Sequence, residues 1–409
     1  MTRPSVAAGR PMLNLGARAA TVAGSYLATA IVVLAAVVIM RRLVSPQLLR
    51  DALSFFFIST LAAGLEPATV KAAVLGGEPG ADAQATSTGA YVCAGAVKAV
   101  AASPFLAALW AFSDPQLDRA SLAWTPLVAI AGFVATDMRV LLDVRGRHAL
   151  AIWLKQGSLM GGLVIVCLML LAGTSLFWAV GVSTAARLAW VGIPLILSGR
   201  FALTTTWNDV RALLADRRWV ELAGASVIAA ASGSMDRVLA LRYLAPATYG
   251  AYFLLYEVFS KFWLLPYLLG PIVFVRRAAR QESAAFIRGA WLATGVAGAL
   301  FLIAVSAVLT WAPSWLARFV GASFGPAVAA FALAIVLAAF TQLRIADLQG
   351  SGATRRATVL IGLGAVISAA VFFMLIRAWG VTGLLIAWLI KSVIELAMTL
   401  VGGRAGLAR

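Results

Sequence analysis

Long apolar stretches alternate with short polar ones along the whole chain. Twelve apolar spans can be recognised, at residues 15–40, 52–75, 90–112, 122–142, 149–172, 176–199, 221–241, 249–275, 286–310, 327–348, 357–377 and 382–401. A helix of roughly 20 apolar residues crosses a bilayer core of about 30 Å. Strands in a membrane would show alternating polarity instead. The pattern therefore predicts an all-α polytopic membrane protein with about 12 transmembrane helices.

The polar connections between these spans are short. The longest lie at 76–89, 204–220 and 311–326, and none could hold a soluble domain. Lysines and arginines are concentrated in the connections on one side, which predicts that both termini are cytoplasmic. The first loop on the opposite side departs from this rule, because it carries Arg41, Arg42 and Arg50.

Composition supports a membrane environment and narrows the chemistry. The chain is 62% hydrophobic and only 12% charged, whereas soluble domains are about a quarter charged. Its net charge of +17 is scattered between apolar spans, so cytoplasmic basic loops explain it better than a nucleic-acid partner. Cys93 and Cys167 lie inside apolar spans and His148 lies in a basic loop. These residues predict no disulfide framework, no metal site and no cofactor.

The two halves of the chain repeat a pattern at an offset of 200 residues. RRLVSPQLLRDA (41–52) matches LRYLAPATYGAY (241–252), so that Arg42 aligns with Arg242 and Pro46 with Pro246. TDMRV (136–140) and TQLRI (341–345) echo each other later, at a slightly larger offset. Six predicted helices separate the partners, so the repeats run parallel, an arrangement that places a binding site at their interface.

The repeat predicts two six-helix lobes around a central cavity. We expect an N-terminal lobe at 1–203, a cytoplasmic linker at 204–220 and a C-terminal lobe at 221–409. Arg42 and Arg242 should then flank the outer end of the cavity.

The segment MDRVLALRYLAPATYGAYFLLYEVFSKFWLLPYLLGP (235–271) places an Asp-Arg pair, a short turn, Gly-Ala-Tyr and late prolines across two spans. With the two six-helix halves, it resembles the multidrug/oligosaccharidyl-lipid/polysaccharide exporter superfamily, and within it the bacterial O-antigen and exopolysaccharide flippases. The resemblance implies alternating-access export of an undecaprenyl-pyrophosphate-linked oligosaccharide across the inner membrane, for surface polysaccharide or lipopolysaccharide synthesis. It leaves open coupling to H+ or Na+ and contact with other polysaccharide-assembly proteins.

Ionisable residues inside the spans are the candidate site residues, because each costs about 2.5–3.5 kcal/mol at the bilayer centre unless it has a partner or faces a cavity. Several pairs at helical spacing can neutralise each other on one helix face; these are Glu257/Lys261, Arg139/Asp143, Lys391/Glu395 and Arg344/Asp347. The remaining charge is mainly positive. The candidate cationic cavity residues are Lys98, Arg187, Arg237, Lys261 and Arg18, and the candidate coupling or pairing acids are Glu66, Asp236 and Glu257.

Purely structural interpretations of these charges stay open beside the functional ones. Lys98 and Arg187 could pair with another helix, and Arg18 could face lipid headgroups. A surplus of cations suits an anionic pyrophosphate, whereas a cation-coupled drug antiporter of the same fold would place acids in the cavity. A membrane enzyme is disfavoured, because a large outer loop is lacking and the sole histidine lies in a loop.

Overall fold

The computed structural model describes residues 11–65, 88–144, 147–197, 206–215, 218–263, 265–266, 269–270, 273, 284–320, 324–351 and 354–404. Within these residues the regular structure is helical throughout, with thirteen α-helices and two 3-10 helices. The all-α prediction is therefore confirmed for the part of the chain that is described.

The helices of the first half are α1 (Pro11–Leu43), α2 (Pro46–Gly64), α5 (Thr88–Ser113), η1 (Arg119–Trp124), α6 (Thr125–Val144), α7 (His148–Leu171) and α8 (Leu176–Leu197). Helix α9 (Trp207–Ala215) lies in the predicted linker. The second half contains α10 (Arg218–Tyr243), α11 (Pro246–Phe259), η2 (Ser260–Trp263), α13 (Ala284–Trp311), α14 (Pro313–Val320), α15 (Ala327–Gly350) and α16 (Thr354–Arg404). Each predicted span overlaps a helix, although the later parts of the spans 52–75 and 249–275 lie largely outside the described residues. The last two spans form the two arms of α16, which kinks at Gly380 (φ 58°, ψ −133°).

Six of the described helices are long and apolar enough to cross a membrane. They are Thr88–Ser113, Arg119–Leu142, Leu150–Leu171, Phe286–Trp311, Ala327–Leu348 and Thr358–Val401. Their outward faces carry large apolar side chains, such as Leu292 (69% exposed), Ile303 (65%) and Val366 (72%). Such faces suit lipid rather than water, so the chain is a multi-pass membrane protein.

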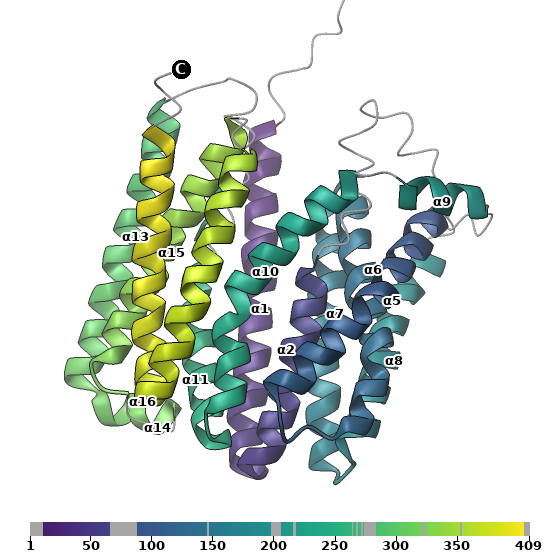
Figure 1. Ribbon diagram of the computed structural model, residues 1–409, viewed down its shortest axis with the longest axis horizontal. Helices are drawn as coiled ribbons and strands as arrows, with labels where there is room; N and C mark the ends of the chain where they lie inside the picture. Colours follow the sequence, from purple (N-terminus) through teal and green to yellow (C-terminus); the bar gives the residue numbers. More distant parts are fainter. Residues whose placement is uncertain are drawn as a thin grey trace, which may run out of the picture.

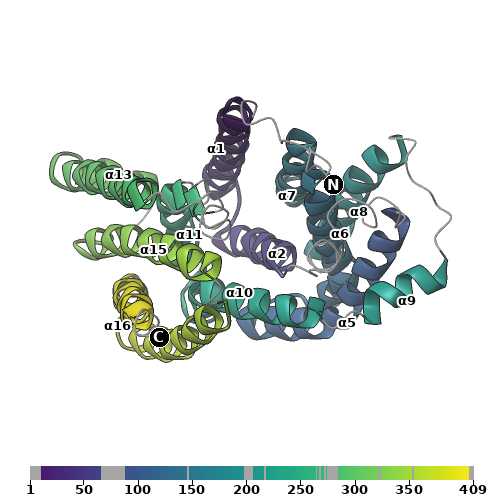
Figure 2. The same cartoon turned by 90° about the horizontal axis from the view of Figure 1, so that it is seen from above.

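The two halves of the chain meet in the middle of the molecule (Figures 1 and 2), with α5–α9 on one side, α13–α16 on the other, and α1, α2, α10 and α11 between them. Within the first half α5 packs on α6, α7 on α8, and α1 on α7. Within the second half α16 packs on α10 and α15. Contact between the halves runs mainly through α2, α5 and α1 on one side and α10 and α11 on the other.

The repeat seen in the sequence appears as two equivalent turns. Helix α1 ends at Leu43 and α10 at Tyr243, while α2 begins at Pro46 and α11 at Pro246. Proline suits the first turn of a helix, because the N–H that it lacks would have no partner there. Both turns lie at the lower edge in Figure 1, at the end of the molecule opposite the C-terminus. We call this end, at residues 43–46 and 243–246, the turn end.

One tryptophan differs from the interfacial position that its place near a span end suggests. Trp110 is fully buried, and its indole nitrogen donates a hydrogen bond to Ser54 Oγ at 3.2 Å. Trp311 and Trp315, by contrast, are 84% and 53% exposed, as expected of a membrane-interface belt. Trp110 therefore joins α5 to α2 instead of facing headgroups.

Candidate functional site

An arginine of the first half bonds directly to the second half at the turn end. Arg50, in the second turn of α2, donates a hydrogen bond from Nη2 to the Leu241 carbonyl near the end of α10. The same Nη2 lies 3.1 Å from Asp114 Oδ1, and both side chains are buried. Because the carboxylate balances its charge, the guanidinium can be held in this apolar setting.

The second half makes a reciprocal contact. Arg242, in the last turn of α10, donates from Nη1 to the Phe112 carbonyl at the end of α5, at 3.4 Å. Its guanidinium carbon lies 5.4 Å from the centre of the Phe112 ring. Each half therefore sends one arginine to a backbone carbonyl of the other half.

This pair of contacts corrects one sequence expectation. Arg242 was expected to flank the outer end of a central cavity with Arg42, and the structure places it at the turn end in contact with the first half. Its repeat partner Arg42 is exposed at the end of α1, and Arg50 makes the crossing contact instead. The reason is that Arg50 lies two turns further along the chain, on the face of α2 that packs against α10.

Apolar packing joins the halves between the two arginines. Gly250 on α11 lies so close to α2 that a Cβ at this position would be 3.0 Å from Leu49 Cδ2. One turn deeper, the Phe56 and Phe253 rings meet edge to face, with centroids 6.1 Å apart. The turn end is thus held closed by packing as well as by hydrogen bonds.

Arg237 is the candidate cation that lies at this interface. Its guanidinium carbon is 5.3 Å from the ring centre of Phe57, on α2, and 4.9 Å from that of Tyr256, on α11. Its Nη2 donates to the Gly233 carbonyl (2.9 Å) and to Ser234 Oγ (3.2 Å). Among the described residues no carboxylate lies within 4 Å of its guanidinium. Its nearest partners are therefore aromatic faces and neutral oxygens, while Asp236 and Glu257 act on its charge from beyond 4 Å.

The neighbouring acid, Asp236, points into the second half. It is fully buried, and Tyr252 donates its hydroxyl proton to Oδ2. Trp388 Nε1 in turn donates to the Tyr252 oxygen at 3.1 Å. Asp236 Oδ1 has no hydrogen-bond partner within the described residues. Adjacent residues diverge on a helix, which separates this acid from Arg237.

Three of the predicted helical pairs are present. Lys261 Nζ lies 2.7 Å from Glu257 Oε2, and Lys391 Nζ lies 3.1 Å from Glu395 Oε2. Arg344 also pairs with Asp347. For the fourth pair, the side chain of Asp143 lies outside the described atoms. Local pairing thus accounts for Lys261 and Glu257, which were candidates for the cavity.

Lys98 and Arg187 lie inside the first half. Lys98 is 6% exposed on α5, and one turn away the Asp137 carboxylate of α6 comes within 3.1 Å of the Cβ position of Gly95. Arg187 is 2% exposed between α7 and α8, with Nε 3.5 Å from Ser158 Oγ. Its Nη1 and Nη2 have no hydrogen-bond partner in the described part of the chain. The close neighbours of Arg187 thus belong to α7 and α8 and not to the second half.

Two candidates cannot be placed. Glu66 lies outside the described residues, and Arg18 belongs to α1 but its side chain is not described. The described residues contain no group of three His, Cys, Asp or Glu side chains that could hold a metal ion. Sequence reasoning missed the role of Arg50, although its departure from the basic-loop rule was a signal.

Comparison with known proteins gives similarity at the level of the fold. No family model and no curated protein sequence matches the chain. The chain is similar to a multidrug resistance MATE family transporter of the MOP superfamily in an inward-facing conformation, with a TM-score of 0.66 and 15% identity, over 94% of this chain and 98% of that one. A mutant of the Vibrio cholerae MATE transporter VcmN has a TM-score of 0.63 and 12% identity, covering 97% of each chain.

A third solved structure is the lipid II flippase MurJ in an inward closed conformation. Its TM-score is 0.62 at 11% identity, and the match covers 94% of this chain and 87% of MurJ. These identities are low, so the matches establish shared architecture and not a shared substrate. The chain has the fold that MATE transporters of the MOP superfamily share with the flippase MurJ.

Proposed function

We propose that the chain is a flippase that exports an anionic lipid-linked oligosaccharide, of the undecaprenyl-pyrophosphate class, across the inner membrane by alternating access. The observation that carries this proposal is Arg237. Its charge lies between α2 of one half and α11 of the other, without a carboxylate within 4 Å in the described residues. The product would serve surface polysaccharide synthesis, such as that of O-antigen or exopolysaccharide.

The chemistry of the interface suits an anion. A guanidinium binds phosphate oxygens through paired, charge-assisted hydrogen bonds. Such bonds are stronger where water is scarce, as they would be between the halves of a membrane transporter. Asp236, the nearest acid in sequence, is bonded to Tyr252, and it acts on the arginine from beyond 4 Å and not through an ion pair.

The moving parts in this proposal are the lobes 1–203 and 221–409, joined by the segment 204–220. Support comes from the fold, which is shared with transporters of two kinds, and from the arrangement of the reciprocal arginines at the turn end. With both termini in the cytoplasm, the turn end faces outward. The contacts of Arg50 and Arg242 then close the outer side, and substrate would enter from the cytoplasmic side.

A second candidate is a cation-coupled drug antiporter of the same fold. Asp236 favours it, because this buried carboxylate has one oxygen without a partner among the described residues. Such an acid could bind H+ or Na+, and two of the similar structures are MATE transporters. The two candidate functions differ in the residue that matters most: Arg237 for the flippase and Asp236 for the antiporter.

Complementation of a clean gene deletion distinguishes them. The deletion should remove surface polymer and leave the lipid-linked glycan on the cytoplasmic face. R237Q should lower polymer export by about 30-fold, because a desolvated cation–π and phosphate contact is worth about 2 kcal/mol. R237K should keep part of the activity, and membrane levels of both variants should match the wild type. Normal polymer in the deletion strain, with increased sensitivity to cationic drugs, would support the antiporter instead.

A further inference from the structure

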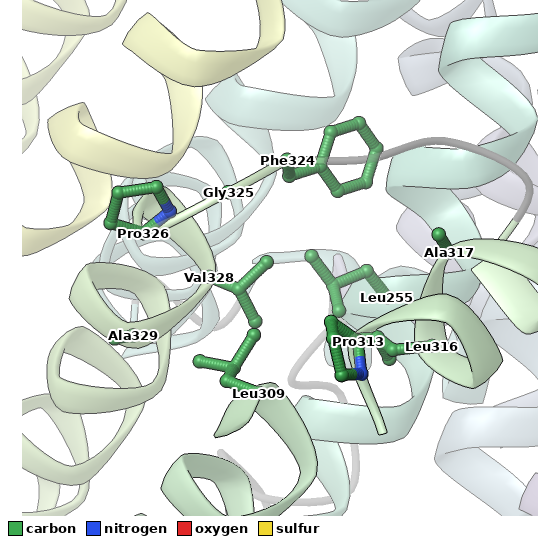
Figure 3. Close-up of a pocket in the computed structure, with 10 residues that line it drawn as sticks. All are labelled: Leu255, Leu309, Pro313, Leu316, Ala317, Phe324, Gly325, Pro326, Val328 and Ala329. Atoms are coloured by element: carbon green, nitrogen blue, oxygen red, sulfur yellow. The ribbon is translucent and has the colours of Figure 1, made fainter. Parts of the chain in front are cut away.

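A cavity lies in the second half, at the turn end and behind α11. Its volume is about 360 Å³, within the size range of small-molecule sites. Leu255 of α11, Leu309 at the end of α13, and Leu316 of α14 line it, together with Phe324 and Val328 beside the start of α15. Figure 3 shows these side chains pointing toward one another from three directions.

The lining of the cavity excludes water and charged ligands. All ten residues that form it are Leu, Val, Phe, Ala, Pro or Gly. Water in a protein cavity needs two to four polar partners, so an apolar cavity of this kind stays dry. Leu255, Val328 and Phe324 are buried, whereas Pro313, Pro326 and Ala329 are exposed. The cavity therefore has a closed apolar floor and a mouth at the surface.

The mouth lies at the level of a membrane interface. Helix α13 exposes Leu292, Leu300 and Ile303 along its length, each by more than 60%, and ends at Trp311, which is 84% exposed. Trp315, on α14, is 53% exposed. Exposed tryptophans at the end of a lipid-facing helix mark the boundary between hydrocarbon and headgroups. Acyl chains are the apolar molecules present at this depth.

An exposed cation lies one residue beyond the lining of the cavity on α14. Arg318 follows Ala317, a lining residue of α14, and its side chain is exposed. Its Nε donates to the Ser314 carbonyl at 3.2 Å. The described residues provide no partner for its Nη1 and Nη2, and these atoms could bind a phosphate. Arginines at this depth commonly interact with anionic headgroups.

We propose that this cavity binds the hydrocarbon chain of a bilayer lipid whose anionic headgroup contacts Arg318. The apolar floor takes the chain, the tryptophans set its depth, and Arg318 selects the headgroup. This inference does not depend on the transported substrate. It would hold equally for a flippase and for a drug antiporter.

Photolabelling of the full chain in nanodiscs tests the site. The probes are phosphatidylglycerol and phosphatidylcholine, each with a diazirine in one acyl chain, and the labelled peptides are identified by mass spectrometry. Labelling should concentrate on the peptides that contain Leu309, Leu316 and Val328, and should be stronger with phosphatidylglycerol. R318Q should remove the preference for phosphatidylglycerol while labelling by both lipids continues.

Variants that fill the cavity with a large side chain provide the second test of the site. A317W should lower labelling of these peptides by about tenfold, which corresponds to roughly 1.4 kcal/mol of lost binding. A329W, at the opposite wall, provides a second filled cavity in case the first variant fails to fold. The matched control is A304W, an exposed alanine of α13 outside the lining, which should leave labelling unchanged. The proposal is wrong if the wild type is not labelled there, if labelling persists in both filled variants, or if the two lipids label equally.

Discussion

At the scale of single residues, Arg187 is the least satisfied charge in the described structure. Its stem packs against Gly162, where an added Cβ would lie 2.6 Å from Arg187 Cδ, and its terminal nitrogens have no partner within the described residues. A buried charge without a partner costs several kcal/mol. The Arg187 charge therefore lowers the stability of the folded protein, whether or not it has a role in function.

Replacing Arg187 with methionine should stabilise the protein, because the apolar stem is kept and the unsatisfied charge is removed. The expected gain is about 1–3 kcal/mol, seen as a higher midpoint of thermal unfolding in detergent. Export should be retained, because Arg187 does not lie at the contact between the halves. A lower midpoint would show that the charge stabilises the fold, and loss of export in a stable variant would assign it a binding role.

Asp114 gives the turn end a pH dependence. Burial raises the pKa of its carboxyl above the ordinary value, and Arg50 lowers it only in part. The folded state thus binds this proton more tightly than the unfolded state does. The contribution of Asp114 to stability is present below its ordinary pKa and is lost as pH rises through the raised pKa.

D114N should therefore lack this part of the pH dependence, and it should be less stable than the wild type at neutral pH, because Arg50 loses the carboxylate that balances its buried charge. Thermal unfolding of both proteins between pH 4 and pH 7.5, at roughly constant ionic strength, measures the effect. If acidification over this range lowers the stability of the wild type steadily and lowers that of D114N by the same amount, Asp114 is not the responsible group.

At this scale the sequence predicted contacts between residues that are close together in the chain. The pairs Glu257/Lys261 and Lys391/Glu395 follow from helical spacing alone, and both are present. The contact of Arg50 with the Leu241 carbonyl joins residues 191 positions apart. No local pattern encodes it. Its trace in the sequence was a basic residue on the side of the membrane where few are expected.

At the scale of helices, hydropathy predicted the spans because each must bridge the same thickness of lipid. It overlooked α9 and α14, which fall inside the predicted polar gaps 204–220 and 311–326. Helices of nine and eight residues are too short to cross a bilayer. They lie against the larger helices instead, α9 on α5 and α14 on α11 and α13.

The close approach of α11 to α2 at Gly250 should control closure of the turn end. G250L would push α11 away from Leu49, weakening the contacts that Arg50 and Arg242 make. The expected result is faster labelling of a cysteine at Leu241 by a membrane-impermeant maleimide, by about tenfold if roughly 1.4 kcal/mol of closure is lost.

The control for this experiment is G289L, because a Cβ at Gly289 meets no atom within 4 Å. Both variants replace a helical glycine with leucine, so the change in helix propensity is the same in the two proteins. Equal labelling of the two variants would mean that the packing at Gly250 does not hold the turn end closed.

At the scale of the whole molecule, the repeat in the sequence predicted two halves related through the turns at 43–46 and 243–246. The structure places these turns at one end, as expected for parallel repeats (Figure 1). The closure of that end could not be predicted, because a transporter sequence has to support both open and closed arrangements. The energy difference between them depends on contacts across the halves, such as those of Arg50 and Arg242.

The central claim is that the two halves move relative to each other around an anionic lipid-linked substrate, so that one end opens as the other closes. Distances between labels on the two halves measure this movement directly. Spin labels at Gln116 and Ala247 report on the turn end, and labels at Arg211 and Val401 report on the opposite end, in a background without Cys93 and Cys167. Adding an undecaprenyl-pyrophosphate-linked oligosaccharide to the reconstituted protein should lengthen the first distance and shorten the second, and R237Q should abolish the response. Unchanged distances with this substrate, together with a clear response to a cationic drug, would contradict the account.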